Sequence, residues 1–314
     1  IAAVAPATLA PATAHAAPYC DALQSQDTLP KKYAKRGPFY SDQNSGWVVG
    51  QDQLKAKFEV TDEARLLWGL IREEFARHGS QLVVMAAPPR PLFLEDSAID
   101  ALGLNAGEIA DLGKGFASYI SALNDAGILA PDLSALAKTE LGGGYYFKRD
   151  THWTPAGAAV SAAQLATHVV GTDTTELLAE LQFDGTFEEK GSLSTVVVMA
   201  CGQRTAPETA ASATFTKAGG TTSLFAEETK PAVALIGTSF SDRYKRDAYQ
   251  VADALSYSFD APVENFSLTG GGLTGAMLAF VESGALAEGA YKTIVWETPY
   301  TAPLTDVNGL RHVL

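Results

Sequence analysis

The sequence predicts an α/β fold with a mainly parallel sheet, and three observations support this class. Short apolar runs typical of strands alternate along the chain with longer stretches of helical periodicity. Residues 232–236 form a continuous apolar run that ends at a glycine, as a strand does before a sharp turn. The 314 residues, 46% of them hydrophobic, are enough for the core of one large domain or two modest ones, and no internal repeat is present.

The first half of the chain contributes strands and helices in alternation. Residues 46–50 are typical of a short strand or hairpin. A helix is expected at residues 61–78, because Thr61 suits the N-cap and apolar residues recur behind it at helical spacing. The next expected elements are a buried strand at residues 81–87, a helix at residues 114–126 and a short strand at residues 128–133.

The second half begins with a turn at residues 142–144, which are all glycine. Thr154 and Pro155 then open a helix, because threonine suits the N-cap and proline suits the first helical position. Residues 205–223, rich in Thr, Ala and Gly, are predicted to form a surface loop. The remaining predicted elements are strands at residues 232–236, 263–267 and 293–296 and a helix at residues 273–286.

The N-terminal segment indicates export. Residues 1–17 are rich in Ala and Pro and end in a small-x-small pattern, like the tail of a secretory signal peptide that lacks its basic start. We therefore expect a periplasmic protein in which residues 18–314 form a single folded domain. The alternative is a flexible Ala/Pro leader on a cytosolic protein.

The cysteine count agrees with export. Cys20 and Cys201 are the two cysteines, and an even number in an oxidising compartment suggests one disulfide. Closing so long a loop would stabilise the fold by about 4 to 5 kcal/mol. Two unrelated buried thiols are the alternative.

Charge and histidine spacing exclude several classes of function. The net charge of −13 argues against nucleic acid, because phosphate binding draws on clustered Lys and Arg. The five histidines show no metal-ligand spacing, so no metal is expected. No uninterrupted apolar stretch is long enough to span a bilayer.

Two motifs together supply the groups for serine acyl transfer. Asp150 precedes His152 by two residues, and Ser239 follows the apolar run at residues 232–236 on a sharp strand-to-helix turn. A serine hydroxyl is a poor nucleophile at neutral pH and needs an imidazole held in the right tautomer. We predict that Ser239 is the nucleophile, His152 the base and Asp150 the group that orients the base. The alternatives are an N-cap for Ser239 and a local polar pair for the other two.

Further candidates follow from the expected sheet, since ligands sit beyond the carboxyl ends of parallel strands. Backbone N–H groups at a helix start after Ser239 are expected to bind the oxyanion, with Gly270 and Asn265 as additional donors. Arg243 is a candidate for an anionic ligand, although a solvated basic face is the alternative. The remaining substrate-binding candidates are Arg90, Tyr145, Trp153 and Glu297, with core packing as the alternative for the aromatic residues.

These motifs resemble a known family. Asp150–Trp153, residues 237–241, Asn265 with the glycine turn at residues 270–272, and residues 296–299 are together similar to the SGNH hydrolase-like domain of the AlgX/AlgJ polysaccharide O-acetyltransferases. The resemblance covers about residues 46–299. It implies a flavodoxin-like three-layer sandwich with a rearranged motif order, and it implies that Asp150, His152 and Ser239 are the triad. The two cysteines also resemble the paired cysteines of the AlgX-type domain.

The resemblance implies a function as well. The expected activity is transfer of acetyl groups to hydroxyls of an exopolysaccharide, alginate or similar, through an acetyl-serine. The family implies an acetyl donor supplied by a membrane-bound O-acyltransferase, a possible exopolysaccharide secretion complex and no soluble cofactor. AlgX continues into a carbohydrate-binding β-domain, which is not expected in this chain. The alternatives are a carbohydrate acetylesterase with the same triad and a non-catalytic polysaccharide-binding or secretion scaffold.

Overall fold

The computed structural model describes residues 17–138, 144–171, 173, 178–179, 181–215, 232–302 and 305–314. Three predicted features lie wholly or partly outside these residues. They are residues 1–16 of the predicted leader, Gly142 and Gly143 of the predicted turn, and residues 216–223 of the predicted loop. No helix of the described part is long and apolar enough to cross a membrane.

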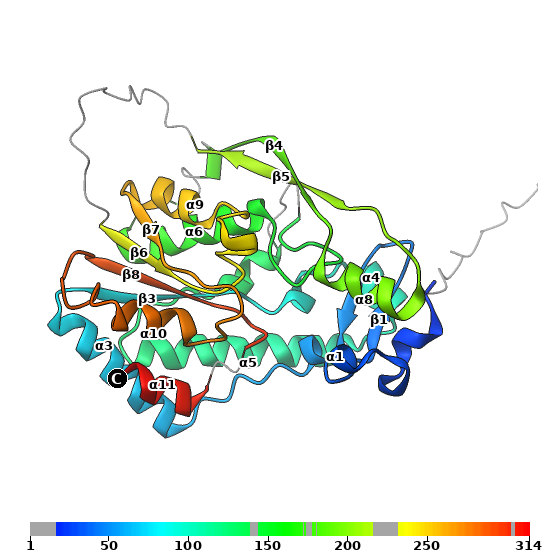
Figure 1. Ribbon diagram of the computed structural model, residues 1–314, viewed down its shortest axis with the longest axis horizontal. Coiled ribbons are helices and arrows are strands. Elements are labelled where there is room, and N and C mark those ends of the chain that lie inside the picture. The colour runs from blue at the N-terminus through cyan, green and yellow to red at the C-terminus, as the bar shows by residue number, and fades with distance from the viewer. Residues whose placement is uncertain are drawn as a thin grey trace, which may run out of the picture.

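Four parallel strands form the central sheet, which confirms the predicted fold class (Figure 1). The strand predicted at residues 232–236 is observed at residues 233–236, all of them buried, as expected for a strand that is covered on both faces. Because the strands are parallel, their carboxyl ends meet at one edge of the sheet. In spatial order the strands are β3 (Gln81–Ala86), β8 (Thr293–Thr298), β6 (Val233–Ile236) and β7 (Val263–Asn265).

Helices cover both faces of this sheet and give three layers (Figure 1). On one face lie α6 (Pro155–Val170) and α9 (Val251–Phe259), which pack against each other. On the other face lie α3 (Asp62–Arg77), α5 (Ala106–Asp125), α10 (Gly275–Glu282) and α11 (Val307–Val313).

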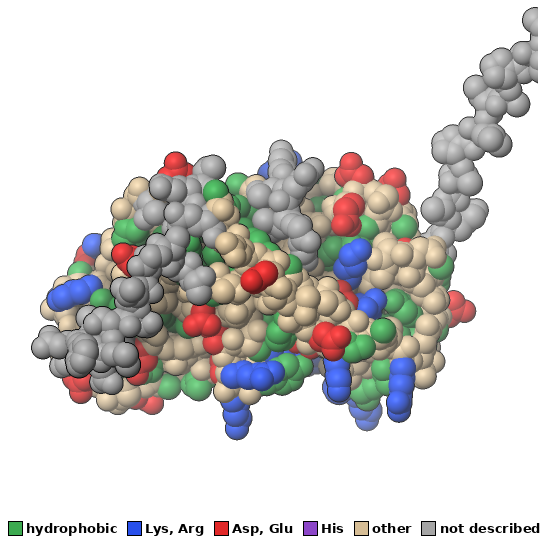
Figure 2. Space-filling model, turned by 90° about the horizontal axis from the view of Figure 1, so that it is seen from above, with side chains coloured by type: hydrophobic (Ala, Val, Ile, Leu, Met, Phe, Trp, Pro, Cys, Tyr) green, Lys and Arg blue, Asp and Glu red, His purple; other side chains and the backbone are tan. Residues whose placement is uncertain are grey.

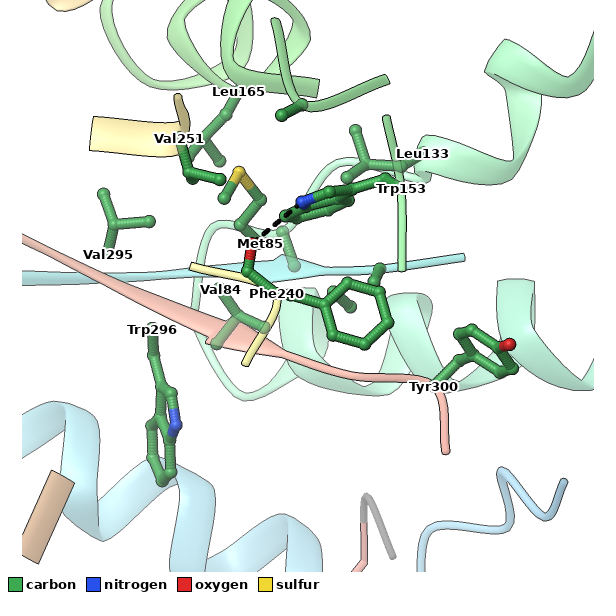
Figure 3. Close-up of a cluster of buried hydrophobic side chains, with 14 of the residues drawn as sticks. Val84, Met85, Leu133, Trp153, Leu165, Phe240, Val251, Val295, Trp296 and Tyr300 are labelled. Atoms are coloured by element: carbon green, nitrogen blue, oxygen red, sulfur yellow. Dashed lines mark hydrogen bonds between the residues drawn. The ribbon is translucent and has the colours of Figure 1, made fainter. Parts of the chain in front are cut away.

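The core occupies the two spaces between the sheet and its helices. Figure 3 shows Met85 of β3 facing Leu165 of α6 and Val251 of α9 on one side of the sheet. Trp296 of β8 points to the opposite side, where its ring lies 4.8 Å from that of Trp68 in α3. The alternation of side chains along each strand therefore fills both layers.

Two predicted helix starts are confirmed by their caps. The Thr61 side chain accepts a hydrogen bond from the Ala64 N–H at 3.1 Å, and Thr154 accepts one from Gly157 at 3.0 Å. The helix predicted at residues 114–126 is longer than expected. It begins at Ala106, because Asn105 caps it through the Gly107 N–H at 2.8 Å.

Two predicted elements are wrong. Residues 128–133 form only one bridge to β3, at Leu129, because the Asn124 amide takes up both the N–H and the C=O of Ala130. Residues 208–214 of the predicted loop form β5 (Glu208–Thr214), which pairs antiparallel with β4 (Gln182–Glu189). Small residues make a strand here because backbone hydrogen bonds hold the pair, and Ala210 and Ala213 point into the core.

A smaller unit packs beside the sheet. Its two-stranded sheet pairs β1 (Phe39–Ser41) with β2 (Val48–Gly50), and only β2 lies within the strand or hairpin predicted at residues 46–50. Its apolar cluster contains Leu23, Phe39, Val48, Leu193 and Val197. The helices nearby are η1 (Asp21–Gln24), η2 (Gln26–Thr28), α1 (Lys31–Ala34), α2 (Gln51–Leu54) and α8 (Ser192–Cys201).

Other short helices of the described residues lie elsewhere in the chain. They are η3 (Arg90–Phe93), α4 (Asp96–Leu102), η4 (Leu133–Lys138) and η5 (Arg243–Lys245).

A disulfide joins Cys20 to Cys201, which confirms the predicted pair. The two cysteines are 181 residues apart, and the bond ties the end of α8 to the start of the described chain. The expectation of two unrelated thiols is therefore excluded.

Removal of this disulfide is expected to lower the free energy of unfolding. The double variant Cys20→Ser/Cys201→Ser loses a cross-link across a long loop, for which chain entropy predicts a loss of about 4 to 5 kcal/mol. Urea unfolding of the variant and of the oxidised wild type measures this difference. Reductant should destabilise the wild type and leave the variant unchanged, and equal stability of the two oxidised proteins would contradict the prediction.

Candidate active site

The Asp/His motif lies in a tight loop just before α6. Tyr146 and Trp153 face each other in an isolated antiparallel bridge, and the Thr154 N–H donates to the Tyr145 carbonyl at 2.9 Å. The loop between them brings Asp150 and His152 together, with the His152 N–H donating to Asp150 Oδ1 at 2.9 Å. The same oxygen forms a short hydrogen bond with His152 Nδ1.

Ser239 lies in the turn after β6, at the carboxyl edge of the sheet. The N–H groups of Ser241 and Asp242 donate to the Thr238 carbonyl at 3.0 and 2.9 Å, which closes a single turn. The predicted helix start at Ser239 is wrong, because the next α-helix, α9, begins only at Val251. Gly237 is required before the turn, since a Cβ there would lie 2.4 Å from the Glu297 carboxylate.

The three predicted residues meet in space. His152 Nε2 lies 2.7 Å from Ser239 Oγ, while Nδ1 faces Asp150. Asp150 has no exposed surface and His152 has 4%, so water is largely excluded from the carboxylate and the imidazole. This arrangement allows the imidazole to accept the serine proton while the carboxylate fixes its tautomer.

Neighbouring groups keep Asp150 ionised despite its burial. Its second oxygen, Oδ2, accepts the Ser192 N–H at the start of α8 at 2.5 Å and lies 3.4 Å from Arg243 Nη2. Burial raises the pKa of Asp150. The charges of His152 and Arg243 and the hydrogen bonds together outweigh this effect and hold the pKa well below its usual range. Arg243 therefore contacts the carboxylate of Asp150. The sequence had indicated only that Arg243 is a candidate for binding an anionic ligand.

Sequence reasoning missed a second buried carboxylate near the triad. Glu189, at the end of β4, accepts hydrogen bonds from the hydroxyls of Tyr244 and Tyr249, each at 2.9 Å. The Tyr249 ring lies 5.5 Å from that of His152. The chain turns just after Glu189 at Gly191, where φ is 82° and a Cβ would lie 2.1 Å from the Arg149 carbonyl, but the sequence alone does not place this turn beside the triad.

Glu297 stabilises the turn that carries Ser239, which we call the nucleophile turn (residues 238–242). Its buried carboxylate accepts the Thr238 N–H at 2.7 Å and the hydroxyls of Thr238 and Ser241 at 3.1 Å each. Glu297 has no exposed surface, so its carboxylate contacts the turn. The sequence had indicated it as a candidate for substrate binding. Burial raises its pKa from 4.5 to about 7, although these hydrogen bonds act in the opposite direction.

Glu297 should make stability depend on pH. Its pKa is higher in the folded state than in the unfolded state, so its contribution is complete below about pH 4.5 and is lost as the pH rises through about 7. Glu297→Gln is expected to remove this part of the decline between about pH 5 and 7.5. Urea unfolding at several pH values measures it.

The matched control is Asp247→Asn. Burial also raises the pKa of Asp247, to about 6, so this variant should remove a separate part of the decline and leave that of Glu297 in place. A Glu297→Gln protein with the wild-type pH dependence would contradict the assignment.

The loop after β7 is tied to the nucleophile turn. Asn265 Nδ2 donates to the Ser241 carbonyl at 2.9 Å, so this amide braces the turn with one of its two N–H groups. The Leu268 N–H donates to the Gly237 carbonyl at 3.0 Å. Within the described residues, no acceptor is found for the backbone N–H of Ser239 or of Gly270.

Three other candidates are buried side chains that pack in the core. Arg90 is fully buried, and its guanidinium donates to the carbonyls of Val48 and Phe147 at 3.0 Å each. Trp153 is fully buried and donates to the Phe240 carbonyl at 3.0 Å (Figure 3). Tyr145 is 4% exposed and borders a separate cavity of about 330 Å³. Core packing and loop bracing therefore account for these side chains.

Charged side chains of both signs lie on the surface. On the face shown in Figure 2, acidic and basic side chains are interspersed and form no continuous basic area. Among the residues that the structure describes, no cluster of His, Cys, Asp or Glu is arranged to hold a metal ion.

The three-layer fold and the Asp-His-Ser arrangement at its sheet edge define an SGNH hydrolase-like domain. The family model described as "SGNH hydrolase-like domain, acetyltransferase AlgX" matches residues 45–300. The chain belongs to this AlgX/AlgJ alginate O-acetyltransferase family.

Curated relatives support this membership. The alginate biosynthesis protein AlgX of Pseudomonas aeruginosa is 30% identical over 251 residues, which cover 78% of this chain and 52% of the relative. The probable alginate O-acetylase AlgJ of Azotobacter vinelandii is 30% identical over 277 residues, which cover 81% and 66%. The chain thus spans about half to two thirds of the length of these relatives.

Solved structures show the same fold. The structure of Pseudomonas aeruginosa AlgX matches with a TM-score of 0.72 at 24% identity, covering 94% of this chain and 70% of that one. The O-acetyltransferase domain of Pseudomonas putida AlgJ matches with a TM-score of 0.58 at 24% identity, covering 82% and 88%.

Proposed function

We propose that this chain is a periplasmic O-acetyltransferase that moves acetyl groups onto hydroxyls of an exopolysaccharide. The observation that carries the proposal is the continuous connection from Asp150 through His152 to Ser239 Oγ, in a chain of the acetyltransferase AlgX family. Alginate or a similar polymer is the proposed acceptor, because the matched relatives are named for alginate biosynthesis and O-acetylation.

In the first half-reaction, Ser239 Oγ attacks the carbonyl carbon of the donor acetyl ester while His152 Nε2 takes the hydroxyl proton. The carbon–oxygen bond to the donor then breaks, and His152 returns the proton to the leaving oxygen. An acetyl-serine remains. Asp150 stabilises the imidazolium that forms between these two proton transfers.

In the second half-reaction, a sugar hydroxyl gives its proton to His152 and attacks the acetyl carbonyl. The bond to Ser239 Oγ breaks, and the serine recovers its proton from His152. The unpaired backbone N–H groups of Ser239 and Gly270 are the proposed donors to the oxyanion in both steps, since a preorganised N–H stabilises the developing charge.

Compartment and partners complete the proposal. The disulfide and the signal-like residues 1–17 support export to the periplasm, where residues 18–314 would act as a single catalytic domain. The proposed donor is delivered by a membrane-bound O-acyltransferase, and the proposed setting is an exopolysaccharide secretion complex. No soluble cofactor is required for the chemistry described.

The test is an assay with a chromogenic acetyl ester, run with and without a sugar oligomer, for the wild type and for Ser239→Ala. Acetylated oligomer identified by mass spectrometry, formed only when Ser239 is present, would support transfer. Acetate as the sole product in the presence of acceptor would support an esterase, and turnover independent of Ser239 would reject the proposal. The absence of any turnover would favour a scaffold.

A further inference from the structure

Two buried carboxylates share one guanidinium beside the triad. Arg243 Nη2 lies 3.4 Å from Asp150 Oδ2 and 3.5 Å from Glu189 Oε1. The two carboxylates have 0% and 1% of their surfaces exposed, respectively. Burial lowers the pKa of Arg243, but the surrounding negative groups, Asp150 first, raise it overall, so the guanidinium stays charged.

The surroundings of Glu189 are those of an ionised carboxylate. Its Oε1 accepts the Gly191 N–H at 3.0 Å and the Tyr244 hydroxyl at 2.9 Å, and its Oε2 accepts the Tyr249 hydroxyl at 2.9 Å. A buried carboxylate with this set of donors and a guanidinium nearby has the partners that its charge requires.

The charge count of the cluster differs with and without Glu189. Asp150, Glu189 and Arg243 together carry a net charge of −1, and protonation of His152 during acyl transfer brings the cluster to neutrality. Without the Glu189 charge, Arg243 would neutralise Asp150, and the same proton transfer would create a net positive charge in a buried site. A low-dielectric environment makes such a difference costly.

We propose that Glu189 is a positioning residue for the acyl-transfer reaction: it acts as the counter-ion of Arg243, so that the charge of Asp150 remains available to the imidazolium of His152. The proposal rests on the acyl-transfer function proposed above. It assigns a catalytic effect to the antiparallel pair of β4 and β5, from which Glu189 reaches the site.

The other titratable groups near His152 do not supply this charge. The Tyr249 ring packs against the imidazole, and burial raises the pKa of its hydroxyl, which is therefore neutral. Burial likewise raises the pKa of Tyr244, which is bonded to Glu189, and of Tyr300, which lies behind Phe240. The Ser239 hydroxyl also faces the ring, 2.7 Å from Nε2.

The test measures the pH midpoint of His152 protonation in four variants. Glu189→Gln should move the midpoint, and with it the acidic limb of the kcat/KM profile, to lower pH by roughly half a unit or more. Arg243→Gln should move both in the opposite direction. The double variant Glu189→Gln/Arg243→Gln restores the net charge of −1 and should return close to the wild type.

The fourth variant is the matched control. Glu188→Gln makes the same chemical change on the exposed neighbour of Glu189 and should leave the midpoint in place. NMR titration of the imidazole resonances, assigned with a His152→Gln sample, gives the midpoint without any turnover. Circular dichroism and thermal unfolding establish that each variant is folded.

The outcomes separate the two proposals. Shifts in the same direction for both single variants, or a double variant whose midpoint does not return toward that of the wild type, would overturn the charge-balance role. If Glu189→Gln does not fold, the midpoint of Arg243→Gln becomes the test of the proposal. An upward shift would support the proposal, and an unchanged midpoint would reject it. Opposed NMR shifts in a protein without Ser239-dependent turnover would uphold the charge balance and reject the proposed function.

Discussion

Replacement of His152 with alanine is expected to lower kcat/KM for a small acetyl ester by roughly four to six orders of magnitude. The variant removes the imidazole whose Nε2 lies 2.7 Å from Ser239 Oγ, so the hydroxyl loses its proton acceptor at the moment of attack. Steady-state hydrolysis of a chromogenic ester measures the loss, and circular dichroism reports on the fold.

The matched control is His78→Ala, which removes an imidazole that pairs with Glu74 on the surface of α3. Its kcat/KM should stay within a factor of a few of the wild type. Activity of His152→Ala comparable to that of the control would remove this residue from the proposed mechanism.

Asp150→Asn is expected to cost about three to four orders of magnitude in kcat with little change in KM. The amide keeps the shape of the side chain and retains an acceptor for the backbone N–H of Ser192, which now donates to Oδ2 at 2.5 Å. It no longer carries the charge that stabilises the imidazolium, and its NH₂ group favours the wrong tautomer of His152. The pH dependence of kcat and KM separates these effects from weaker substrate binding.

An exposed carboxylate provides the comparison for this variant. Asp125→Asn changes an exposed side chain at the end of α5 that pairs with Arg65, and it should leave kcat unchanged. Equal kcat for Asp150→Asn and Asp125→Asn would show that the buried carboxylate has no catalytic effect.

The strands and major helices were predictable where a local pattern was strong. The apolar run at residues 232–236 became β6, and the caps at Thr61 and Thr154 marked helix starts within one residue. Residues 208–214 were missed because small polar residues carry no strand pattern of their own, and pairing with β4 decides their structure.

The helix α8 was missed for a different reason. Its run of valines is typical of a strand, but burial of Val196 and Val197 against the smaller apolar cluster stabilises a helix instead. Gly202, with a φ of 68° at the helix end, was a usable signal, because a left-handed glycine commonly ends a helix.

The triad could be predicted because its chemistry requires three specific residue types, and two of them stand in one short motif. The residues around it could not. Glu189 reaches Asp150 only through the pairing of β4 with β5 and the contact with Arg243, and Glu297 reaches the nucleophile turn only through the order of strands in the sheet. Such neighbours depend on three-dimensional assembly and leave no local pattern.

Helix α8 connects the disulfide to the carboxylate of Asp150. The N–H of Ser192, the first residue of α8, donates a hydrogen bond to the carboxylate of Asp150. The last residue of α8 is Cys201, which forms the disulfide. In a reducing compartment, packing and backbone hydrogen bonds to the Arg149 carbonyl would still hold α8, but the position of Ser192 against Asp150 would be less constrained. The proposed activity is therefore expected to fall when the disulfide is reduced.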